Sequence, residues 1–524
     1  MKSALSLAGL GPKALLARRK FDTRDYPAAL ELVTELLQKH PDNAALLHLT
    51  AEINTRTGEL SQALVAYDSL VRVDSSARWK VAKRSVEGRL RETDPSWLPV
   101  VPFPQQGESG TSILYLAKES RPFLSNGFCT RTHETLVSLG AAGVDITCVT
   151  MPGFPAVIEA QNPPHESSVE GVTYRHLLPR AGRLAKDLPY DDYLQLATQL
   201  LARETQRLSV GLIHVGSGHR GYETALVGSA VARWAGIPWV YEVRSFFENT
   251  WSADRRYNES SEYYHRRLLS ERRMMHAADA VVTISGPMRD EIVNVHGIDP
   301  AKVRVIPNAV DVEKFNPEPK SAELVRELDL GDNFVVGYIS NLSHPREGQE
   351  VLIRAIAESR RRGHKVVGLL VGDGSRRSEL EELARAEGVS DRVRFVGSVP
   401  FDKIASYYAL IDLFVVPRVD ERAARLVSPI KPFEAMAMRI PLLTSDLPAL
   451  AEIIGNGERG QTFRAGDHID LATKVNELRH DVARRVSMTQ AAYTWVRTER
   501  SWGSTASAFS GLYDSLVSGK AATS

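Results

Sequence analysis

Cysteine is scarce in this sequence: its 524 residues include only Cys129 and Cys148. Two cysteines cannot form the disulfide framework of a small secreted domain, and neither stands in the spacing of a zinc site. Long hydrophobic runs are also missing, since none approaches the ~20 residues that span a bilayer. The opening segment, residues 1–11, has one lysine and an apolar patch too brief for a signal peptide. We therefore expect a cytoplasmic protein, and we leave a peripheral contact with a membrane open.

A strong charge of either sign is likewise missing. The sequence has 65 Lys and Arg against 64 Asp and Glu, a formal net charge of +1. This balance gives no support for a nucleic-acid partner. The hydrophobic fraction of 43% and charged fraction of 25% are those of globular proteins and argue against disorder or a fibre. At this length a single hydrophobic core is unusual, so we expect two or three domains.

Residues 1–95 carry helical periodicity and no strand-like runs. The pattern of residues 25–30 returns at 59–64, about one tetratricopeptide period of ~34 residues later. Ala29 and Ala63 occupy the matched position where two helices must approach closely. The segment thus resembles tetratricopeptide repeats. Two repeats bury little core, so we expect them to pack on the following domain or to bind a partner protein. An ordinary helical hairpin without a binding role is the alternative.

A linker rich in proline and glycine, residues 96–110, precedes a change of pattern. Beyond it, short apolar runs alternate with helical stretches, as buried parallel strands do in α/β proteins. One series covers 111–315 and a second covers 330–490. We predict two Rossmann-like domains facing across a cleft, with 491–524 forming helices that cross back to the first domain. Ligands bind at the carboxyl ends of parallel strands, so the cleft would hold one site.

The glycine fingerprint of dinucleotide-binding enzymes is missing too. After the first apolar run the chain reads Ser125-Asn126-Gly127 and not G-x-G-x-x-G, which argues against a nicotinamide enzyme. Gly127 stands between a strand end and a helix start, where a glycine lets the backbone approach a phosphate or a sugar. We therefore take Gly127 as a donor-binding candidate, with an ordinary turn glycine as the alternative.

Several stretches resemble, in the right order, one enzyme family. They are Gly211-Leu212-Ile213-His214, residues 236–244, residues 278–285, Ile306-Pro307-Asn308-Ala309-Val310-Asp311 with Phe315, residues 371–374, residues 393–397 and Lys431-Pro432-Phe433-Glu434-Ala435-Met436-Ala437. From about Ile113 to Val517 the chain resembles the retaining glycosyltransferases of group 1, which have the GT-B fold and include sucrose synthases and bacterial mannosyltransferases. The Tyr-Glu-Val-Arg at 241–244 is similar to members associated with exosortases and polysaccharides.

The resemblance implies an activity. Such an enzyme moves a sugar from a UDP- or GDP-linked donor to a saccharide or lipid-linked acceptor, with retention of the anomeric configuration. The second domain would bind the donor and the first domain the acceptor, and domain closure would exclude water. No Asp-x-Asp stands at an expected strand end, and the family implies neither a metal nor another cofactor.

The donor-side candidates lie around the start of one helix. A diphosphate leaving group requires backbone N–H groups at a helix start, together with cations. We expect Ser428 and Ile430 to supply N–H groups, whereas Pro429 has none. By the resemblance, Glu434 accepts hydrogen bonds from two ribose hydroxyls, and Lys431 is a candidate cation. Capping of its own helix is the alternative for Glu434.

The family's usual cations are not at their expected positions. Asn341 stands where the family has an arginine, and Glu347 where it has a lysine. A carboxylate facing a diphosphate would repel it. We expect Arg346 and Lys431 to substitute, although each could instead be a solvated surface charge. Two reserve candidates are Arg418 and Arg425.

Two further departures affect the sugar and the first domain. Leu426 replaces a glutamate that touches the sugar ring in the family, so the sugar is not predicted. Gly216 replaces the second histidine of a His-x-His pattern. His214 fits the first one but, on a strand, we interpret it as a core residue. We expect His219, in a glycine-rich loop, and Arg220 beside it to be catalytic.

Glu242 and Arg244 end the next strand of the first domain and are acceptor-side candidates. An ion pair within the domain is their alternative. The departures from the family's pattern also support a rival: a catalytically weak or inactive transferase fold that acts as a binding or scaffold protein through its repeats. An epimerase or a phosphorylase of the same fold is a second rival.

Overall fold

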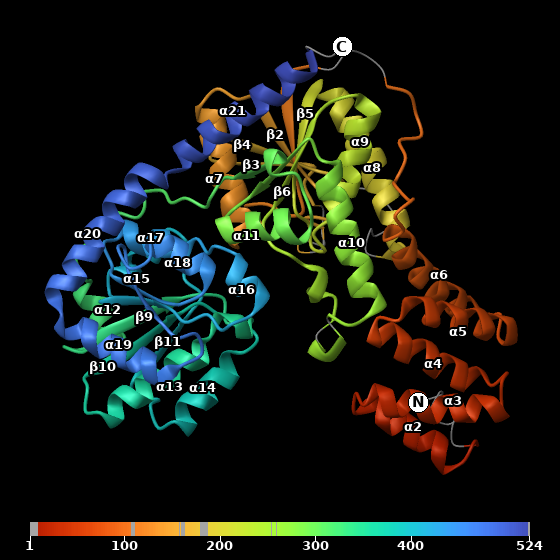
Figure 1. Ribbon diagram of the computed structural model, residues 1–524, viewed down its shortest axis with the longest axis horizontal. Helices are drawn as coiled ribbons and strands as arrows, with labels where there is room; N and C mark the ends of the chain where they lie inside the picture. The colour runs from red at the N-terminus through yellow and green to blue at the C-terminus, as the bar shows by residue number, and fades with distance from the viewer. Residues whose placement is uncertain are drawn as a thin grey trace. The chain divides into compact units, whose positions relative to one another are not determined.

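The computed structural model describes residues 9–105, 110–156, 158, 163–178, 187–252, 254–257 and 259–521. The chain forms two compact units (Figure 1). The first comprises Met1–Leu124, Asp145–Val281 and Ser515–Ser524, and the second comprises Ser125–Val144 and Val282–Asp514. Residues 1–8 of the opening segment and 106–109 of the predicted linker lie outside the described residues. Within the described part of the chain, no helix has both the length and the apolar character needed to cross a bilayer.

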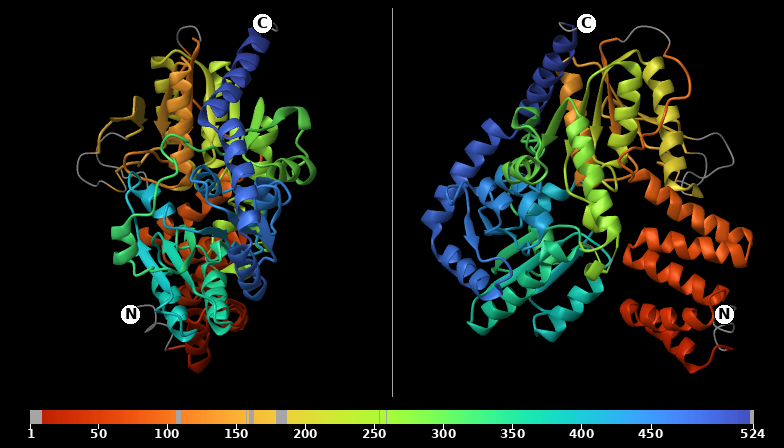
Figure 2. Two further views of the ribbon diagram at one scale, coloured as in Figure 1. Left: turned by 90° about the vertical axis from the view of Figure 1, so that its left-hand side faces the viewer. Right: turned by 45° about the vertical axis from the view of Figure 1, so that its right-hand side comes forward.

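The N-terminal region is all helical. Its helices are α2 (Pro12–Asp22), α3 (Tyr26–Lys39), α4 (Ala44–Thr57), α5 (Leu60–Val73) and α6 (Ala77–Glu92). Figure 2 shows these red to orange helices as one stack. The Asn43 side chain caps α4 by accepting from two backbone N–H groups at 3.1 Å. Ala29 and Ala63 are fully buried, as the repeat pattern predicts. The helical repeat region is therefore confirmed.

An eight-stranded sheet follows, in the order β3-β4-β2-β1-β5-β6-β7-β8. Its strands are β1 (Ser112–Ala117), β2 (Ile146–Thr150), β3 (Glu166–Val169), β4 (Val172–His176), β5 (Val210–Gly216), β6 (Trp239–Val243), β7 (Ala280–Thr283) and β8 (Val303–Val305), and the neighbouring helices are α7 (Gly127–Ala141), α8 (Tyr190–Arg207), α9 (Glu223–Ala235), α10 (Glu262–Ala277) and α11 (Gly286–Asp290). β1 pairs in parallel with β2 and β5, and β5 with β6. The antiparallel β3–β4 pair at the sheet edge is missing from the predicted strands, because its alternating exposed residues form no continuous apolar run.

The helical repeats pack on the α/β part of the same unit. Tyr263 of α10 is buried in the apolar cluster of α4, α5 and α6. Ser61 donates to the Glu262 carboxylate through its N–H at 2.8 Å and its hydroxyl at 2.6 Å. At Gly58, with φ of 84°, an added Cβ would lie 2.6 Å from the Trp251 ring, so this turn requires glycine. These contacts confirm that the two repeats pack on the following domain.

The second unit contains a six-stranded sheet in the order β11-β10-β9-β12-β13-β14, with parallel pairing throughout. Its strands are β9 (Phe334–Ile339), β10 (Val366–Val371), β11 (Val393–Gly397), β12 (Leu413–Val416), β13 (Leu442–Ser445) and β14 (Gln461–Phe463), and its helices include α12 (Ala322–Glu327), α13 (Gln349–Arg361), α14 (Arg377–Ala386), α15 (Ile404–Tyr408), α16 (Arg422–Leu426), α17 (Lys431–Ala437), α18 (Pro448–Ile454), α19 (His468–His480) and α20 (Val482–Glu499). The last helix of the chain is α21 (Trp502–Ala521). The strands are buried along most of their length, which explains the continuous apolar runs of the sequence.

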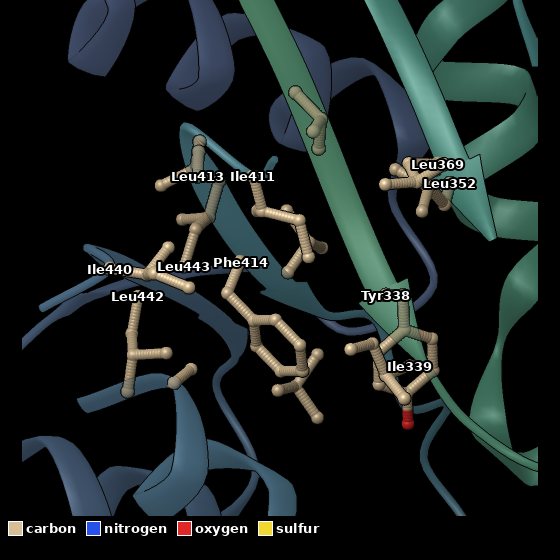
Figure 3. Packing of buried hydrophobic residues seen from close by; sticks show 14 of the residues in the cluster. Tyr338, Ile339, Leu352, Leu369, Ile411, Leu413, Phe414, Ile440, Leu442 and Leu443 are labelled. Atoms are coloured by element: carbon tan, nitrogen blue, oxygen red, sulfur yellow. The ribbon is translucent and has the colours of Figure 1, made fainter. Parts of the chain in front are cut away.

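The core of the second sheet fixes the orientation of side chains that end its strands. The rings of Tyr338 on β9 and Phe414 on β12 lie 6.0 Å apart, and Figure 3 shows them among the leucines and isoleucines of neighbouring strands. An added Cβ at Gly337 would lie 2.4 Å from the Ile411 side chain, so β9 packs closely on the segment that leads into β12. This packing leaves the Tyr338 hydroxyl at the end of β9, where the polar groups of the site begin.

The C-terminal helices use their tryptophans as packing residues. The Trp495 ring of α20 lies 6.0 Å from the Phe433 ring and stacks under Arg459 at 4.1 Å. Trp502, the first residue of α21, is buried. From Ser515 onward α21 is grouped with the first unit. The predicted boundaries at 111–315, 330–490 and 491–524 stay predictions.

Candidate active site

The strand order of the second sheet marks a ligand crevice. The chain runs outward from β9 through β10 to β11 and then returns to place β12 on the other side of β9. In such sheets, ligands bind outside the carboxyl ends of the two strands where the order reverses. The loops that follow β9 and β12 meet there. An added Cβ at Gly348, with φ of 70°, would lie 1.9 Å from the Pro417 carbonyl oxygen, so only glycine allows this approach.

A buried ion pair joins these two loops. Arg418 donates from Nη2 to Glu347 Oε1 at 3.1 Å and from Nε to Oε2 at 3.3 Å, and the Tyr338 hydroxyl also donates to Oε2. Arg418 Nη1 reaches the Val427 carbonyl oxygen at 2.9 Å. Burial favours the neutral acid, but Arg418, the Tyr338 hydroxyl and Arg346 outweigh it and lower the pKa of Glu347 to about 2. Glu347 is therefore ionised and neutralised by Arg418.

This geometry corrects the expectation that the Glu347 carboxylate would face a diphosphate and repel it. Glu347 is only 8% exposed, and its charge is matched by Arg418. The carboxylate thus anchors Arg418, which in turn holds the segment before α17 through Val427. Sequence reasoning treated Arg418 as a reserve cation and missed the pairing, because the two partners are 71 positions apart.

The other cations expected on the donor side are more accessible. Arg346 is one-third exposed, with Nε 3.6 Å from Glu347 Oε1. Arg425 is half exposed and pairs with Asp420 at 3.0 Å. Lys431 is the partly exposed first residue of α17. The contacts of Arg346 and Lys431 with a diphosphate stay predictions.

Glu434 lies in the first turn of α17 and is buried. The Tyr408 hydroxyl donates to Glu434 Oε2 at 2.5 Å, and Tyr408 is itself fully buried. Ile430, the N-cap residue of α17, makes no side-chain cap hydrogen bond, and capping by Glu434 stays the alternative to ribose binding. Burial raises the pKa of Glu434, although Lys431, the Tyr408 hydroxyl and Lys314 counteract this. The result is a carboxylate with one oxygen held by an internal phenol, and its contact with ribose stays a prediction.

The segment before α17, residues 426–430, is also held through its backbone; because the predicted contacts with the donor lie there, it is called the donor loop. Asn308 Nδ2 donates to the Ser428 carbonyl oxygen at 2.8 Å, while Asn308 Oδ1 accepts from Arg131 Nη1 at 3.2 Å. Buried Arg131 further donates to the carbonyl oxygens of Pro307 at 2.8 Å and Ile306 at 2.7 Å. Sequence reasoning quoted the 306–311 motif only for resemblance and missed this role. The motif was the available signal, but its partners are distant in sequence.

Asn308→Ala is expected to lower the free energy of unfolding by about 1–2 kcal/mol, because the Ser428 carbonyl loses its partner in a buried setting. It should also reduce the thermal shift that a bound nucleotide produces, because the donor loop loses a restraint. The matched control is Asn333→Ala, which removes a similar 2.7 Å bond to the Leu330 carbonyl elsewhere in the unit. Equal nucleotide shifts in both variants would contradict the role of Asn308.

Two remaining donor-side positions have local explanations. Gly127 is the first residue of α7, and an added Cβ there would meet no atom within 4 Å. The protein itself therefore does not require glycine at this position, and donor contact at Gly127 stays a prediction. Asn341 accepts from the Ser343 N–H at 2.7 Å and so stabilises its own turn. The Leu426 carbonyl accepts from the Ser285 hydroxyl at 2.6 Å, a further tie to the donor loop.

The first sheet has its own reversal of strand order, between β1 and β5. The loops that follow these strands bring together His219 and Glu119, whose Nε2 and Oε2 atoms lie 3.9 Å apart. The His219 side chain is 66% exposed, so it is accessible to a ligand at the strand ends. Sequence reasoning singled out His219 and missed Glu119. The catalytic role of His219 stays a prediction.

Arg220, the neighbour of His219, has a different environment. Its guanidinium forms an ion pair with Glu92, donates to the Tyr263 hydroxyl at 2.6 Å and lies 3.3 Å over the Tyr190 ring. These partners belong to α6, α10 and α8. The contacts give Arg220 a structural task that the sequence did not suggest, and its predicted catalytic role is untested.

Glu242 and Arg244 form a buried cluster with residues of β1 and β5. Glu242 Oε2 accepts from Tyr115 at 2.7 Å and from Arg244 Nη2 at 2.5 Å, and His214 Nε2 lies 3.4 Å from it. The ion pair within the domain is thus confirmed, while acceptor contact stays a prediction. An added Cβ at Gly216 would lie 2.8 Å from the Tyr115 hydroxyl oxygen, which explains the glycine at that position.

Family models match three parts of the chain. "Glycosyl transferases group 1" matches residues 333–481, "Glycosyl transferase 4-like domain" matches 126–309, and "Tetratricopeptide repeat" matches 20–84. The two transferase models together cover more than half of the chain. Residues 333–481 are thus a group 1 glycosyltransferase domain, residues 126–309 a glycosyl transferase 4-like domain and residues 20–84 tetratricopeptide repeats.

Two relatives illustrate the similarity in sequence. A GDP-mannose-dependent alpha-(1-6)-phosphatidylinositol monomannoside mannosyltransferase of Mycobacterium tuberculosis is 30% identical over 234 residues, which are 44% of this chain and 60% of that protein. A D-inositol 3-phosphate glycosyltransferase of Stackebrandtia nassauensis is 26% identical over 364 residues, 66% of this chain and 79% of that protein. The alignment with the mannosyltransferase thus spans less than two thirds of its length.

Solved structures establish the fold. Sucrose-phosphate synthase from Thermosynechococcus elongatus matches with a TM-score of 0.63 at 22% identity, covering 78% of this chain and 100% of that structure. HepE of Anabaena, in complex with UDP, matches with a TM-score of 0.60 at 19% identity and the same coverage. At these identities the likeness shows the fold alone, and it confirms the GT-B fold predicted from the sequence.

Proposed function

We propose that this protein transfers a sugar from a UDP- or GDP-linked donor to a hydroxyl group of a saccharide or lipid-linked acceptor, with retention of the anomeric configuration. The observation that carries the proposal is the buried Glu434 carboxylate, which Tyr408 holds at 2.5 Å in the first turn of α17, inside the matched group 1 domain. A vicinal diol such as that of ribose can donate two hydrogen bonds to one carboxylate.

The proposed roles divide between the two units. In the second unit Glu434 binds ribose, while Arg346, Lys431 and the N–H groups of Ser428 and Ile430 neutralise the diphosphate. Charge stabilisation of the leaving diphosphate comes from these groups in the proposal, without a metal ion or cofactor. The names of the relatives support nucleotide-sugar chemistry, since one is GDP-mannose-dependent and another was solved with UDP.

In the first unit His219 and Glu119 face the acceptor at the ends of β1 and β5. In the retaining reaction that we propose, the departing diphosphate takes the acceptor proton on the same face of the sugar. No strong protein base is then required, and His219 orients the acceptor hydroxyl. Glu242 and Arg244, joined in their buried pair, belong to the acceptor side in this proposal.

A thermal-shift panel tests the donor proposal. UDP, GDP and ADP, each with a matching nucleotide-sugar, are added to the full chain. We expect one nucleobase class to stabilise the protein, by about 2.7 kcal/mol when the ligand stands at 100 times its Kd. Release of nucleotide from the stabilising sugar donor then measures turnover. A panel without any shift would remove the proposal.

A second candidate function is a nucleotide-sugar-binding or scaffold protein with little turnover, whose repeats bind a protein partner. The closed Glu347–Arg418 pair favours it, because the charge of Arg418 is already matched inside the protein. Leu426 favours it as well, because a leucine cannot hydrogen-bond a sugar hydroxyl. A thermal shift without any release of nucleotide over hours would support this candidate, whereas measurable release would exclude it.

A further inference from the structure

The last helix of the repeat region carries a carboxylate into the α/β part of the first unit. Glu92, the final residue of α6, is fully buried. An anion at a helix C-terminus is opposed by the helix dipole, so α6 itself gains nothing from it. Its partners lie outside the repeats: Arg220 forms an ion pair with Oε1, and the Tyr263 hydroxyl donates to the same oxygen at 3.1 Å. The position of Glu92 is therefore explained by tertiary contact.

The partner of Glu92, Arg220, is held through its backbone as well as through its side chain. The Arg220 N–H donates to Glu223 Oε2 at 2.8 Å, and the Arg220 carbonyl accepts from Arg267 Nη2 at 3.3 Å. Its guanidinium is stacked over Tyr190 at 3.3 Å. The ion pair with Glu92 completes this set. Contacts from four different segments thus converge on Arg220, and Glu92 supplies the counter-charge of its guanidinium.

The loop around Arg220 has little freedom of its own. The Gly218 N–H donates to the Gly221 carbonyl oxygen at 2.9 Å, which closes the loop over His219 and Arg220. Added Cβ atoms would lie 2.3 Å from the Glu223 carboxyl carbon at Gly218 and 2.5 Å from a carboxylate oxygen of α10 at Gly221. A side chain at Gly218 would displace the Glu223 carboxylate, and one at Gly221 would also be strained, because φ there is 93°. In such a loop the placement of Arg220 fixes that of His219.

We infer that the helical repeats act within this chain to position the acceptor side of the site: Glu92 is a positioning residue that sets the His219 loop through Arg220. This inference rests on the proposed function for its effect on catalysis, but its structural part does not. The repeats thus support the loop after β5 from within the same chain, whether or not they also bind another protein.

Two other glutamates serve as controls, because they distinguish positioning of the His219 loop by Glu92 from docking of the repeats onto the α/β part of the unit. Glu262 binds Ser61 at 2.6 and 2.8 Å and so fastens the repeats to α10 without touching the His219 loop. Glu87 lies on α6, five positions before Glu92, and pairs with Lys83 at 3.3 Å on the surface. Glu262→Gln therefore weakens docking alone, and Glu87→Gln serves as a surface control on the same helix.

The test compares Glu92→Gln with these controls in the full chain by hydrogen–deuterium exchange. In Glu92→Gln we expect faster exchange in peptides covering residues 214–226, and no such change in Glu262→Gln or Glu87→Gln. Arg220→Met should show the same increase, and the double variant no further one, because both changes break one contact. Unchanged exchange in Glu92→Gln, or an equal increase in Glu262→Gln, would overturn the inference.

A kinetic arm tests the catalytic consequence with the sugar donor that stabilises the protein and water as acceptor. Displacement of a positioned group by about 1 Å can cost about 100-fold in rate, so kcat for nucleotide release should fall roughly 10- to 100-fold in Glu92→Gln. The donor KM should stay within a factor of about two, since the donor side is intact, and Glu92→Asp should recover part of kcat. Wild-type protein that releases no nucleotide would count against the proposed function. The exchange experiment would still decide whether Glu92 positions the His219 loop.

Discussion

Replacing Glu347 with glutamine is expected to destabilise the second unit by about 3–5 kcal/mol, because it leaves the buried Arg418 guanidinium without its counter-charge. The pKa of Glu347 supports this size. A carboxyl whose pKa falls from 4.5 to about 2 on folding contributes about 3 kcal/mol at neutral pH. The Tyr338 hydroxyl would lose its charged acceptor in the same substitution.

The pH dependence of this contribution has a definite sign. Because folding lowers the pKa of Glu347, the stabilisation is fully present above pH 4.5 and is lost as the pH falls toward about 2. Urea unfolding of wild type and variant at several pH values therefore should give curves that converge on acidification. Glu381→Gln, which removes a partly exposed pair with Arg377, is the control and should cost less than about 0.5 kcal/mol. A Glu347→Gln variant as stable as this control would show that the buried pair carries little stability.

Glu434→Gln is expected to weaken nucleotide binding about 100-fold or more, because two hydrogen bonds from ribose hydroxyls to a charged acceptor are lost or weakened. In the thermal-shift panel this would remove the shift seen with wild type at the same nucleotide concentration. The substitution keeps the size of the side chain, so the packing around Tyr408 and α17 remains.

The stability of the Glu434 variant separates binding from folding. Burial raises the pKa of Glu434 in the folded protein, so its ionised form opposes folding once the pH exceeds its ordinary pKa, and an amide carries no such cost. Glu434→Gln protein should thus unfold near the wild-type temperature when no ligand is present. Tyr408→Phe is the second variant, and it should weaken binding less, because it removes only the internal donor at 2.5 Å. A full nucleotide shift in Glu434→Gln would remove the donor-site assignment.

Individual residues show which parts of the candidate site could be predicted from local sequence. His219 was predicted as a site residue because it is a histidine in a glycine-rich loop after a buried strand; its side chain is 66% exposed, and its role stays a prediction. Glu434 was predicted through the Lys-Pro-Phe-Glu-Ala-Met-Ala motif, and its contact with ribose likewise stays a prediction. Glu119, Arg131 and Asn308 were missed as site residues, because nothing in their local pattern indicates which distant groups they meet.

Local sequence also could not distinguish a substrate contact from an internal pair. Glu242 and Arg244 stand two residues apart on one strand, so both readings were open until Tyr115 and His214 were found around the same carboxylate oxygen. Glu347 looked unfavourable for a diphosphate until Arg418 was found against it. In each case the deciding partner comes from another strand or loop.

The sequence by itself determined the architecture of this protein: a helical repeat region followed by two α/β domains of the group 1 glycosyltransferase type. It could do so because hydrophobic periodicity and turn residues act over a few positions and are repeated along the chain. Only the tertiary structure decided which charges neutralise one another, as in Glu347 with Arg418 and Glu92 with Arg220, partners 71 and 128 positions apart. Such pairs form where folding takes at least one of the two groups out of water and brings its counter-charge to it, a condition that no local pattern records.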